Sequence, residues 1–124
     1  MIVAQVKRAA KPGTKIPKPN TDRPYKVKDW GTRRGEEALV YLIPNLRNPE
    51  RPYEKGITES EWEKAYGQIM RTGTFTRRWF GSKMQACANE GGCNFTTIGG
   101  VFQLLGIAEY QRGEYVRKDS ILVR

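Results

Sequence analysis

Histidine is absent from the sequence, and its only cysteines are Cys87 and Cys93. Without histidine, the chain lacks the side chain that most often acts as a general base or proton shuttle near neutral pH. A zinc site needs about four ligands, which two cysteines cannot supply, so we expect neither a metal nor a cofactor. The two thiols are expected to pack as small apolar groups, because a disulfide is unexpected in a reducing compartment.

Long apolar runs are also missing. No segment approaches the roughly 20 apolar residues of a membrane span, and the first seven residues are too short and too soon charged for a secretion signal. We therefore expect no membrane association and a cytoplasmic protein. No catalytic motif is present, so the protein is not expected to be an enzyme. The 124 residues suffice for one domain with an appendage.

Acidic residues are scarce relative to basic ones, 13 against 22, which gives a net charge of +9. Residues 1–35 contain ten of the basic residues and only two acidic ones, so a polyanion would be attracted to that end first. Four prolines among residues 1–24 predict an extended basic arm, separate from a single domain over residues 25–124. The arm could follow nucleic-acid phosphates or be a solvated tail.

Two strands are predicted at residues 25–30 and 37–43, as an extension before the main domain. The glycine-flanked turn between them carries Arg33 and Arg34. These could present two guanidinium groups to phosphate, or could simply be solvated. Residues 45–56 are predicted to be a loop, because two prolines lie among polar side chains.

Three helices are predicted in the remainder of the chain. The first runs from a capping box that begins at Thr58 to Gly73, a residue type that often ends a helix. A short strand at residues 74–76 leads to a second helix over 77–87. The third is predicted over 96–105, where apolar residues recur at helical spacing.

A β-hairpin is predicted after the helices, with strands at residues 107–111 and 114–118 around Arg112-Gly113. This order of elements resembles the winged-helix variant of helix-turn-helix proteins. The resemblance covers about residues 57–118 and implies an α+β, winged-helix-like fold with a three-helix core and a C-terminal hairpin wing. The segment at residues 89–97 also resembles small uncharacterised bacterial proteins of mobile elements and gene cassettes.

The resemblance implies DNA contacts by the second helix, the third helix and the wing. Arg77 and Arg78 lie in the first turn of the second predicted helix, where they could join the first-turn amides in binding phosphate or pair with nearby glutamates. The third predicted helix contains no arginine, but its Asn, Thr and Gln side chains could address adenine edges and thymine methyl groups. The residues predicted to contact nucleic acid are Arg33, Arg34, Arg77, Arg78, Lys83, Asn94, Thr96, Thr97, Gln103, Arg112, Arg117 and Lys118.

Gly99 and Gly100 are unfavourable inside a helix, by about 2 kcal/mol together. Their presence implies close approach of another backbone, from DNA, from a second subunit or from the protein's own N-terminal strands. We therefore expect a small protein that binds nucleic acid, first of all duplex DNA, mainly through phosphates, as a transcriptional or mobile-element accessory factor. The alternative is a protein-interaction or dimerisation module that uses the Gly99/Gly100 face and the terminal segment at residues 119–124.

Overall fold

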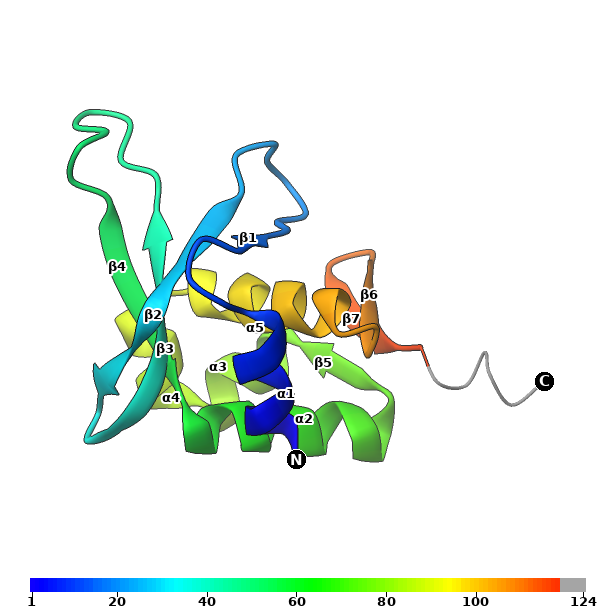
Figure 1. Cartoon of the computed structure of the whole chain (residues 1–124). Helices are drawn as coiled ribbons and strands as arrows, with labels where there is room; N and C mark the ends of the chain where they lie inside the picture. Colours follow the sequence, from blue (N-terminus) through cyan, green and yellow to red (C-terminus); the bar gives the residue numbers. More distant parts are fainter. Residues whose placement is uncertain (119–124) are drawn as a thin grey trace.

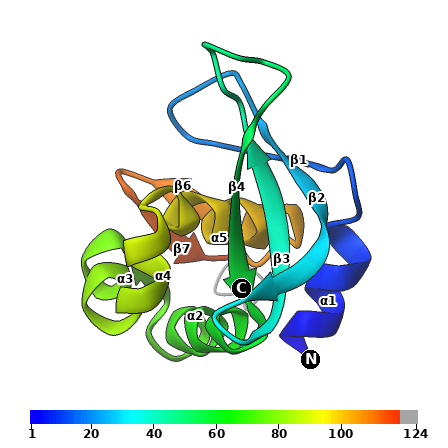
Figure 2. The same cartoon turned by 90° about the vertical axis from the view of Figure 1, so that its left-hand side faces the viewer.

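The computed structural model describes residues 1–118, which form two antiparallel sheets and five helices. Figure 1 shows the larger sheet on one side of the molecule, helix α5 crossing the centre, and helix α2 running beneath it. The side view in Figure 2 shows the same arrangement, with α1 beside α2 at the base of the molecule. The five helices are α1 (Ile2–Ala9), α2 (Glu59–Thr72), α3 (Arg77–Lys83), α4 (Gln85–Glu90) and α5 (Cys93–Leu104).

The larger sheet has the strand order β1-β2-β3-β4. Its strands are β1 (Lys15–Ile16), β2 (Tyr25–Arg33), β3 (Glu36–Ile43) and β4 (Tyr53–Thr58). Strand β3 lies inside the sheet and buries residues 38–41, as its unbroken apolar sequence predicts. Arg34 and Gly35 form the turn between β2 and β3 with φ values of 50° and 79°, the left-handed conformation of tight hairpin turns. The two predicted strands are therefore confirmed.

The smaller sheet has the order β5-β7-β6, with β5 (Thr74–Thr76), β6 (Ala108–Gln111) and β7 (Glu114–Arg117). The predicted hairpin is confirmed as β6 and β7, with Arg112 and Gly113 at its turn. The predicted capping box is also confirmed, because Thr58 accepts a hydrogen bond from the Glu61 backbone and the Glu61 side chain accepts one from the Thr58 backbone. Gly73 ends α2 in a left-handed conformation, as predicted.

Helix α5 packs against β1 and β4 of the larger sheet and against β6 of the smaller one. A Cβ atom on Gly99 would lie 2.1 Å from the ring of Tyr115 in β7. A Cβ atom on Gly100 would lie 2.5 Å from the carbonyl oxygen of Pro17, which directly follows β1. The close approach that these glycines implied is thus made within the chain itself.

The expected winged-helix-like fold, with a three-helix core and a C-terminal hairpin wing, is wrong. A four-stranded sheet precedes helices α2 to α5 and packs on α5, so strands and helices build the core together. Ile16, Val27, Leu39 and Ile57 of that sheet belong to the same buried cluster as Trp62 of α2. The two-stranded extension expected from the sequence is therefore half of a sheet that is integral to an α+β core.

Residues 1–24 do not form an extended arm along their whole length. Helix α1 buries Ile2 and Val6, whose spacing of four places them on one face of the helix. All four prolines of this region follow α1, so they do not interrupt it. Strand β1 then joins the edge of the larger sheet.

Three further boundaries differ from the predictions. The loop predicted over residues 45–56 gives way to β4 at Tyr53. The helix predicted over 77–87 is interrupted at Met84, whose φ and ψ of −126° and 53° separate α3 from α4. Helix α5 begins at Cys93, three residues before the predicted start.

Cys87 and Cys93 are both free thiols. Over residues 1–118, no helix is both long and apolar enough to cross a membrane, and no three Cys, Asp or Glu side chains gather where they could hold a metal ion. The predictions for residues 119–124 lie outside the described residues.

Candidate functional site

The structure places Arg33 and Arg34 in ion pairs. The Arg34 guanidinium donates two hydrogen bonds to the Glu61 carboxylate, at 2.7 and 2.8 Å, and one to Glu90 at 2.7 Å. Arg33 Nε donates to the other oxygen of Glu90 at 3.2 Å, and its Nη2 lies 3.8 Å from Glu54. These contacts tie the β2–β3 turn to α2 and α4, so the two arginines have a structural role where the sequence predicted phosphate contact.

The same pairs control the ionisation of the two glutamates. Burial alone would raise the pKa of Glu61 and of Glu90, but hydrogen bonds from Arg34 and from the backbone outweigh it. Both carboxyl groups therefore have a pKa below their usual range and remain charged at neutral pH. A phosphate would have to displace them to reach Arg33 or Arg34.

Arg77, Arg78 and Lys83 lie on α3. Arg77 Nη1 donates to the Gly92 carbonyl oxygen at 3.0 Å, and the guanidinium lies 4.7 Å from the centre of the Phe95 ring. Arg78 and Lys83 are exposed and line one shallow hollow. Arg78 and Lys83 thus lie near each other and are available, whereas Arg77 is held against α5.

The polar residues of α5 face inward, against the prediction that this helix reads bases. Asn94 is fully buried, accepts a hydrogen bond of 2.6 Å from the Tyr41 hydroxyl, and donates one to the Cys87 carbonyl oxygen. Thr96 and Thr97 both accept hydrogen bonds from Lys18. Gln103, near the end of the helix, is half-buried. The α5 side chains predicted to contact DNA are therefore occupied inside the protein or partly covered.

Of the hairpin residues predicted to contact DNA, one is exposed and the others are bonded or partly buried within the protein. Arg112 is exposed at the β6–β7 turn, where its φ is 51°. Arg117 Nη1 donates to the Met70 carbonyl oxygen at the end of α2. Lys118, the last described residue, is half-buried and its backbone N–H bonds to Ile107. Only Arg112 projects from this hairpin as a wing contact would.

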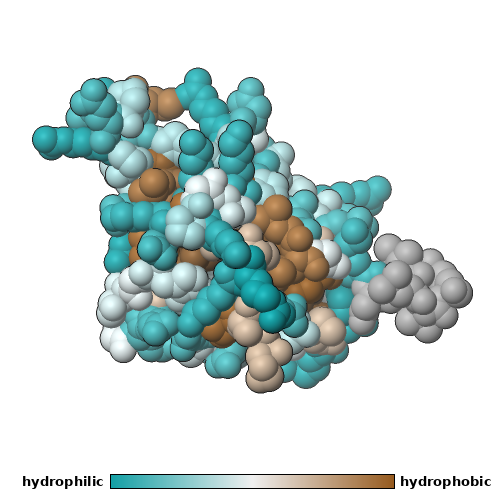
Figure 3. All heavy atoms as spheres, in the orientation of Figure 1, coloured by the Kyte–Doolittle hydropathy of each residue, from teal (hydrophilic) through white to brown (hydrophobic). Residues whose placement is uncertain are grey.

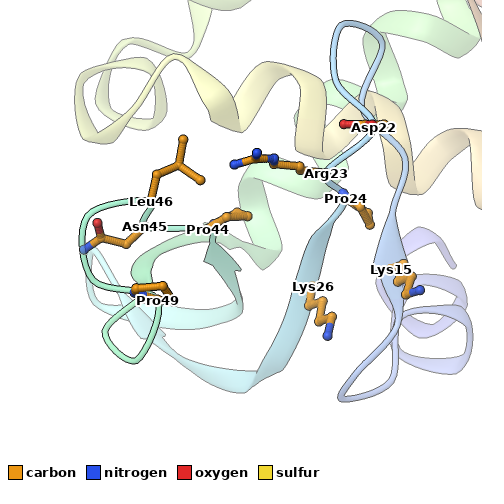
Figure 4. Close-up of a pocket in the computed structure, with 9 residues that line it drawn as sticks. All are labelled: Lys15, Asp22, Arg23, Pro24, Lys26, Pro44, Asn45, Leu46 and Pro49. Carbon is orange, nitrogen blue, oxygen red and sulfur yellow. The ribbon is translucent and has the colours of Figure 1, made fainter.

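A different cluster of cations lies at the opposite end of the larger sheet, in a cleft of about 450 Å³ that we call the loop cleft. Its walls are the β1–β2 connection and the β3–β4 connection, the two long loops that project together in Figure 1. Figure 4 shows the lining side chains, with Arg23 extending from one loop toward the other. The lining residues are Lys15, Asp22, Arg23, Pro24, Lys26, Pro44, Asn45, Leu46 and Pro49.

Lys15 and Lys26 are directly opposite each other in the β1–β2 pair, so their side chains lie on the same face of the sheet. Like charges in this arrangement are destabilising. Within residues 1–118, neither lysine nor Arg23 takes part in an ion pair. In the described part of the chain, the loop cleft therefore contains three cations with no protein anion bound to them, and Asp22 is its only acidic lining residue.

The walls of the loop cleft also offer apolar surface. Pro24, Pro44 and Pro49 line it, and Leu46 is 71% exposed. Tyr53, 56% exposed, is the first residue of β4 after the second loop. Figure 3 shows that the two projecting loops are largely hydrophilic, with small hydrophobic patches between the polar side chains.

Sequence reasoning found the basic N-terminal segment but missed the loop cleft. Lys15 and Arg23 lie within the predicted basic arm of residues 1–24, and Lys26 lies within the strand predicted at residues 25–30. The available signal was a dense alternation of proline with lysine and arginine over residues 11–28. The opposing wall, at residues 44–52, has a net charge of only +1, from Arg47, Glu50 and Arg51, and most of it was predicted to be an ordinary loop.

No protein-family model matches this chain, and neither a curated protein nor a solved structure shows significant similarity to it. Its function is therefore inferred from the placement of its own residues.

Proposed function

We propose that this is a cytoplasmic protein that binds nucleic acid through the loop cleft, mainly by contacts with phosphates. The observation that supports this most strongly is that Lys15, Lys26 and Arg23 line one cleft and, over residues 1–118, have no carboxylate partner. Holding two lysines face to face is unfavourable for the free protein, and a bound phosphate between them would remove the repulsion.

The distribution of charge over the whole chain also supports this proposal. Although the net charge is +9, the arginines of the β2–β3 turn are neutralised by glutamates. The cations of residues 11–26 are not neutralised in this way, so the field of the protein is concentrated at the loop end of the larger sheet. A nucleic-acid strand would be attracted there first.

For the alternative, a protein-interaction module that uses the Gly99/Gly100 face and residues 119–124, the glycine face is not open as a surface, and residues 119–124 lie outside the described residues. Tyr115 and Pro17 of the same chain cover the two glycines, and both glycines are buried. A partner could contact them only if the chain opened.

The experiment is a binding titration of the intact protein with duplex and with single-stranded DNA over a range of salt, from about 50 to about 300 mM. Three phosphate contacts predict a slope of log affinity against log salt of about −2 to −3. Comparison of the two DNA forms shows which one the loop cleft prefers. If affinity is independent of salt, or if neither form binds at low salt, the proposal fails.

A further inference from the structure

A second pocket, of about 200 Å³, lies on the other side of the β1–β2 connection, and we call it the Lys18 pocket. Its polar lining residues are Lys18, Asn20, Thr21, Tyr25, Arg77 and Thr96. They come from the loop after β1, from β2, from α3 and from α5. The pocket shares a loop with the loop cleft but shares none of its cations.

The Lys18 ammonium group is enclosed by neutral groups. Its Nζ donates to the Thr97 hydroxyl at 2.6 Å, to the Thr96 hydroxyl at 2.9 Å and to the Cys93 carbonyl oxygen at 3.2 Å. It also lies 4.0 Å from the centre of the Tyr25 ring and 5.6 Å from that of Tyr41. Buried charges in proteins are usually paired with an opposite charge, but within residues 1–118 no carboxylate pairs with Lys18.

This environment changes the proton affinity of the amine. The pKa of Lys18 is lowered to about 7, mainly by burial; Cys93 opposes this lowering, and the Arg77 guanidinium adds to it. The remaining groups that face Nζ are the Cys93 carbonyl oxygen, the two threonine hydroxyls and the Tyr25 and Tyr41 rings. Each hydroxyl can accept a hydrogen bond from the charged amine or donate one to the neutral amine, so the site accommodates both forms.

Arg77 supplies the second cation. One of its nitrogens is held by Gly92 and the plane of the guanidinium lies over Phe95, which fixes its position at the edge of the pocket. No acidic side chain is among the lining residues. A guanidinium and an ammonium thus share a small cavity whose other polar groups are hydroxyls and one amide.

We propose that the Lys18 pocket is a binding site for a phosphate monoester group, which Arg77 contacts directly. Lys18 contributes its charge, because its three N–H groups already donate to Thr96, Thr97 and the Cys93 carbonyl oxygen. The volume of the pocket accommodates a phosphate with a small substituent. The two cations match the nearly two negative charges of such a group, and the Thr21 hydroxyl and the Asn20 amide can donate to its oxygens. The bound anion stabilises the protonated form of Lys18, so binding takes up a proton from solution.

A phosphate monoester could come from a small metabolite or from the terminal phosphate of a nucleic-acid strand. The first experiment therefore measures binding of methyl phosphate by calorimetry at pH 8, where its second pKa of about 6 leaves it a dianion. Repeating the titration in two buffers of different ionisation enthalpy gives the number of protons taken up. We expect uptake of nearly one proton by the wild-type protein.

Two variants test the assignment of residues. Arg77→Gln should weaken methyl phosphate binding about tenfold or more, because it removes a charge-assisted contact. Lys18→Arg keeps a permanent charge, so it should bind methyl phosphate without proton uptake. Absence of binding to the wild-type protein, unchanged affinity in Arg77→Gln, or equal proton uptake in Lys18→Arg and wild type would each overturn the proposal.

The second experiment compares a 5′-phosphorylated DNA strand with the same strand ending in a 5′-hydroxyl. An Arg77-dependent preference for the phosphorylated strand identifies the strand end as the ligand, and methyl phosphate binding without that preference identifies a small metabolite. Replacing Lys15 and Lys26 by Gln should leave methyl phosphate binding intact. A result that disproves phosphate binding at the Lys18 pocket can therefore be distinguished from one that disproves nucleic-acid binding at the loop cleft.

Discussion

Gly100 of α5 lies so close to Pro17 that a Cβ atom at position 100 would be 2.5 Å from the Pro17 carbonyl oxygen. The next residue, Lys18, donates hydrogen bonds to the hydroxyls of Thr96 and Thr97 on the same helix. The loop after β1 is therefore fastened to α5 by both backbone packing and a side chain. This contact explains why the helix expected to read DNA is covered on this side, and why Gly100 occurs within it.

Replacing Gly100 by Ala should destabilise the protein by about 1–3 kcal/mol, because backbone atoms of Pro17 must move to admit the methyl group. The gain in helix propensity, about 1 kcal/mol, would not offset this. Gly67 of α2 is the matched control, since nothing lies within 4 Å of a Cβ atom there. Gly67→Ala should therefore stabilise the protein. The free energy of unfolding of both variants is measured by denaturant titration. Equal changes at the two positions would contradict the close contact between Gly100 and Pro17.

The protonation of Lys18 should be visible in the pH dependence of stability. Its pKa is about 7 in the folded protein and has its ordinary value of 10.5 in the unfolded chain. Between these values the unfolded chain binds more protons, so this group makes the free energy of unfolding rise with pH, by at most about 1.4 kcal/mol per pH unit. In Lys18→Met that contribution is absent.

The quantity to measure is the difference in unfolding free energy between wild type and Lys18→Met at several pH values. We expect it to shift in favour of wild type by about 2 kcal/mol from pH 7 to pH 9. Taking the difference is necessary because burial raises the pKa of the Cys87 thiol, which opposes the effect in both proteins. Lys11→Met, at an exposed position, should give a curve parallel to wild type. If the curve of unfolding free energy against pH for Lys18→Met were also parallel to that of wild type, the lowered pKa of Lys18 would be refuted.

The Arg34 ion pairs should stabilise the fold at neutral pH and lose their effect in acid. Arg34→Met leaves Glu61 and Glu90 partly buried without their main partner, and should cost about 2 kcal/mol at pH 7. Both carboxyl groups have a folded pKa below the ordinary value of 4.5, so the contribution is present above that pH and is lost as the pH falls through the folded values. Arg78→Met, at an exposed position, should change stability by less than about 0.5 kcal/mol. If Arg34→Met were still less stable than wild type by the same amount in strong acid, the ion pairs could not be the cause of its lower stability.

Lys26→Glu should separate stability from binding. It replaces a like-charge pair with an opposite-charge pair across β1 and β2, so we expect a gain of about 0.2–1 kcal/mol in unfolding free energy together with weaker DNA binding. Lys28 on the same strand pairs with Glu54 at 2.8 Å, and Lys28→Glu should therefore be destabilising. Thermal unfolding and a DNA titration on each variant test this contrast. Loss of stability in Lys26→Glu would mean that the lysine pair is not under strain.

Signals that act over a few residues were predicted correctly from the sequence. The Thr58–Glu61 capping box, the left-handed Gly73 and the Arg112-Gly113 turn all depend on bonds between neighbours in the chain. The apolar run of β3 likewise specified a buried strand without reference to its partners.

What failed depends on contacts between distant segments. Helix α1 has only two fully covered positions of its own, Ile2 and Val6, and its burial requires α2 and α5 beneath it. The short strand β1 exists only because β2 lies beside it, and β4 because β3 does. The order of the later elements suggested a familiar fold, but it carried no information on whether another sheet would cover α5.

In the candidate sites, too, composition predicted some features, whereas others depend on contacts between distant segments. That residues 1–35 are strongly basic could be counted, but the direct opposition of Lys15 and Lys26 depends on strand register. Likewise, the glutamate partners of Arg33 and Arg34 come from more than 20 positions away in the chain. Composition identified the charge, whereas its availability depended on the fold.

The central claim is that the loop cleft, and not the α3 and hairpin surface, binds nucleic acid. Its most direct test compares two triple variants of equal net charge, one with Gln at Lys15, Arg23 and Lys26, the other with Gln at the exposed residues Arg78, Lys83 and Arg112. For each, the affinity for DNA is measured over a range of salt. We predict that the first set reduces the steepness of the log affinity against log salt plot by about 2 to 3, while the second leaves it within about 1 of wild type. An equal or larger loss in the second set would contradict the account.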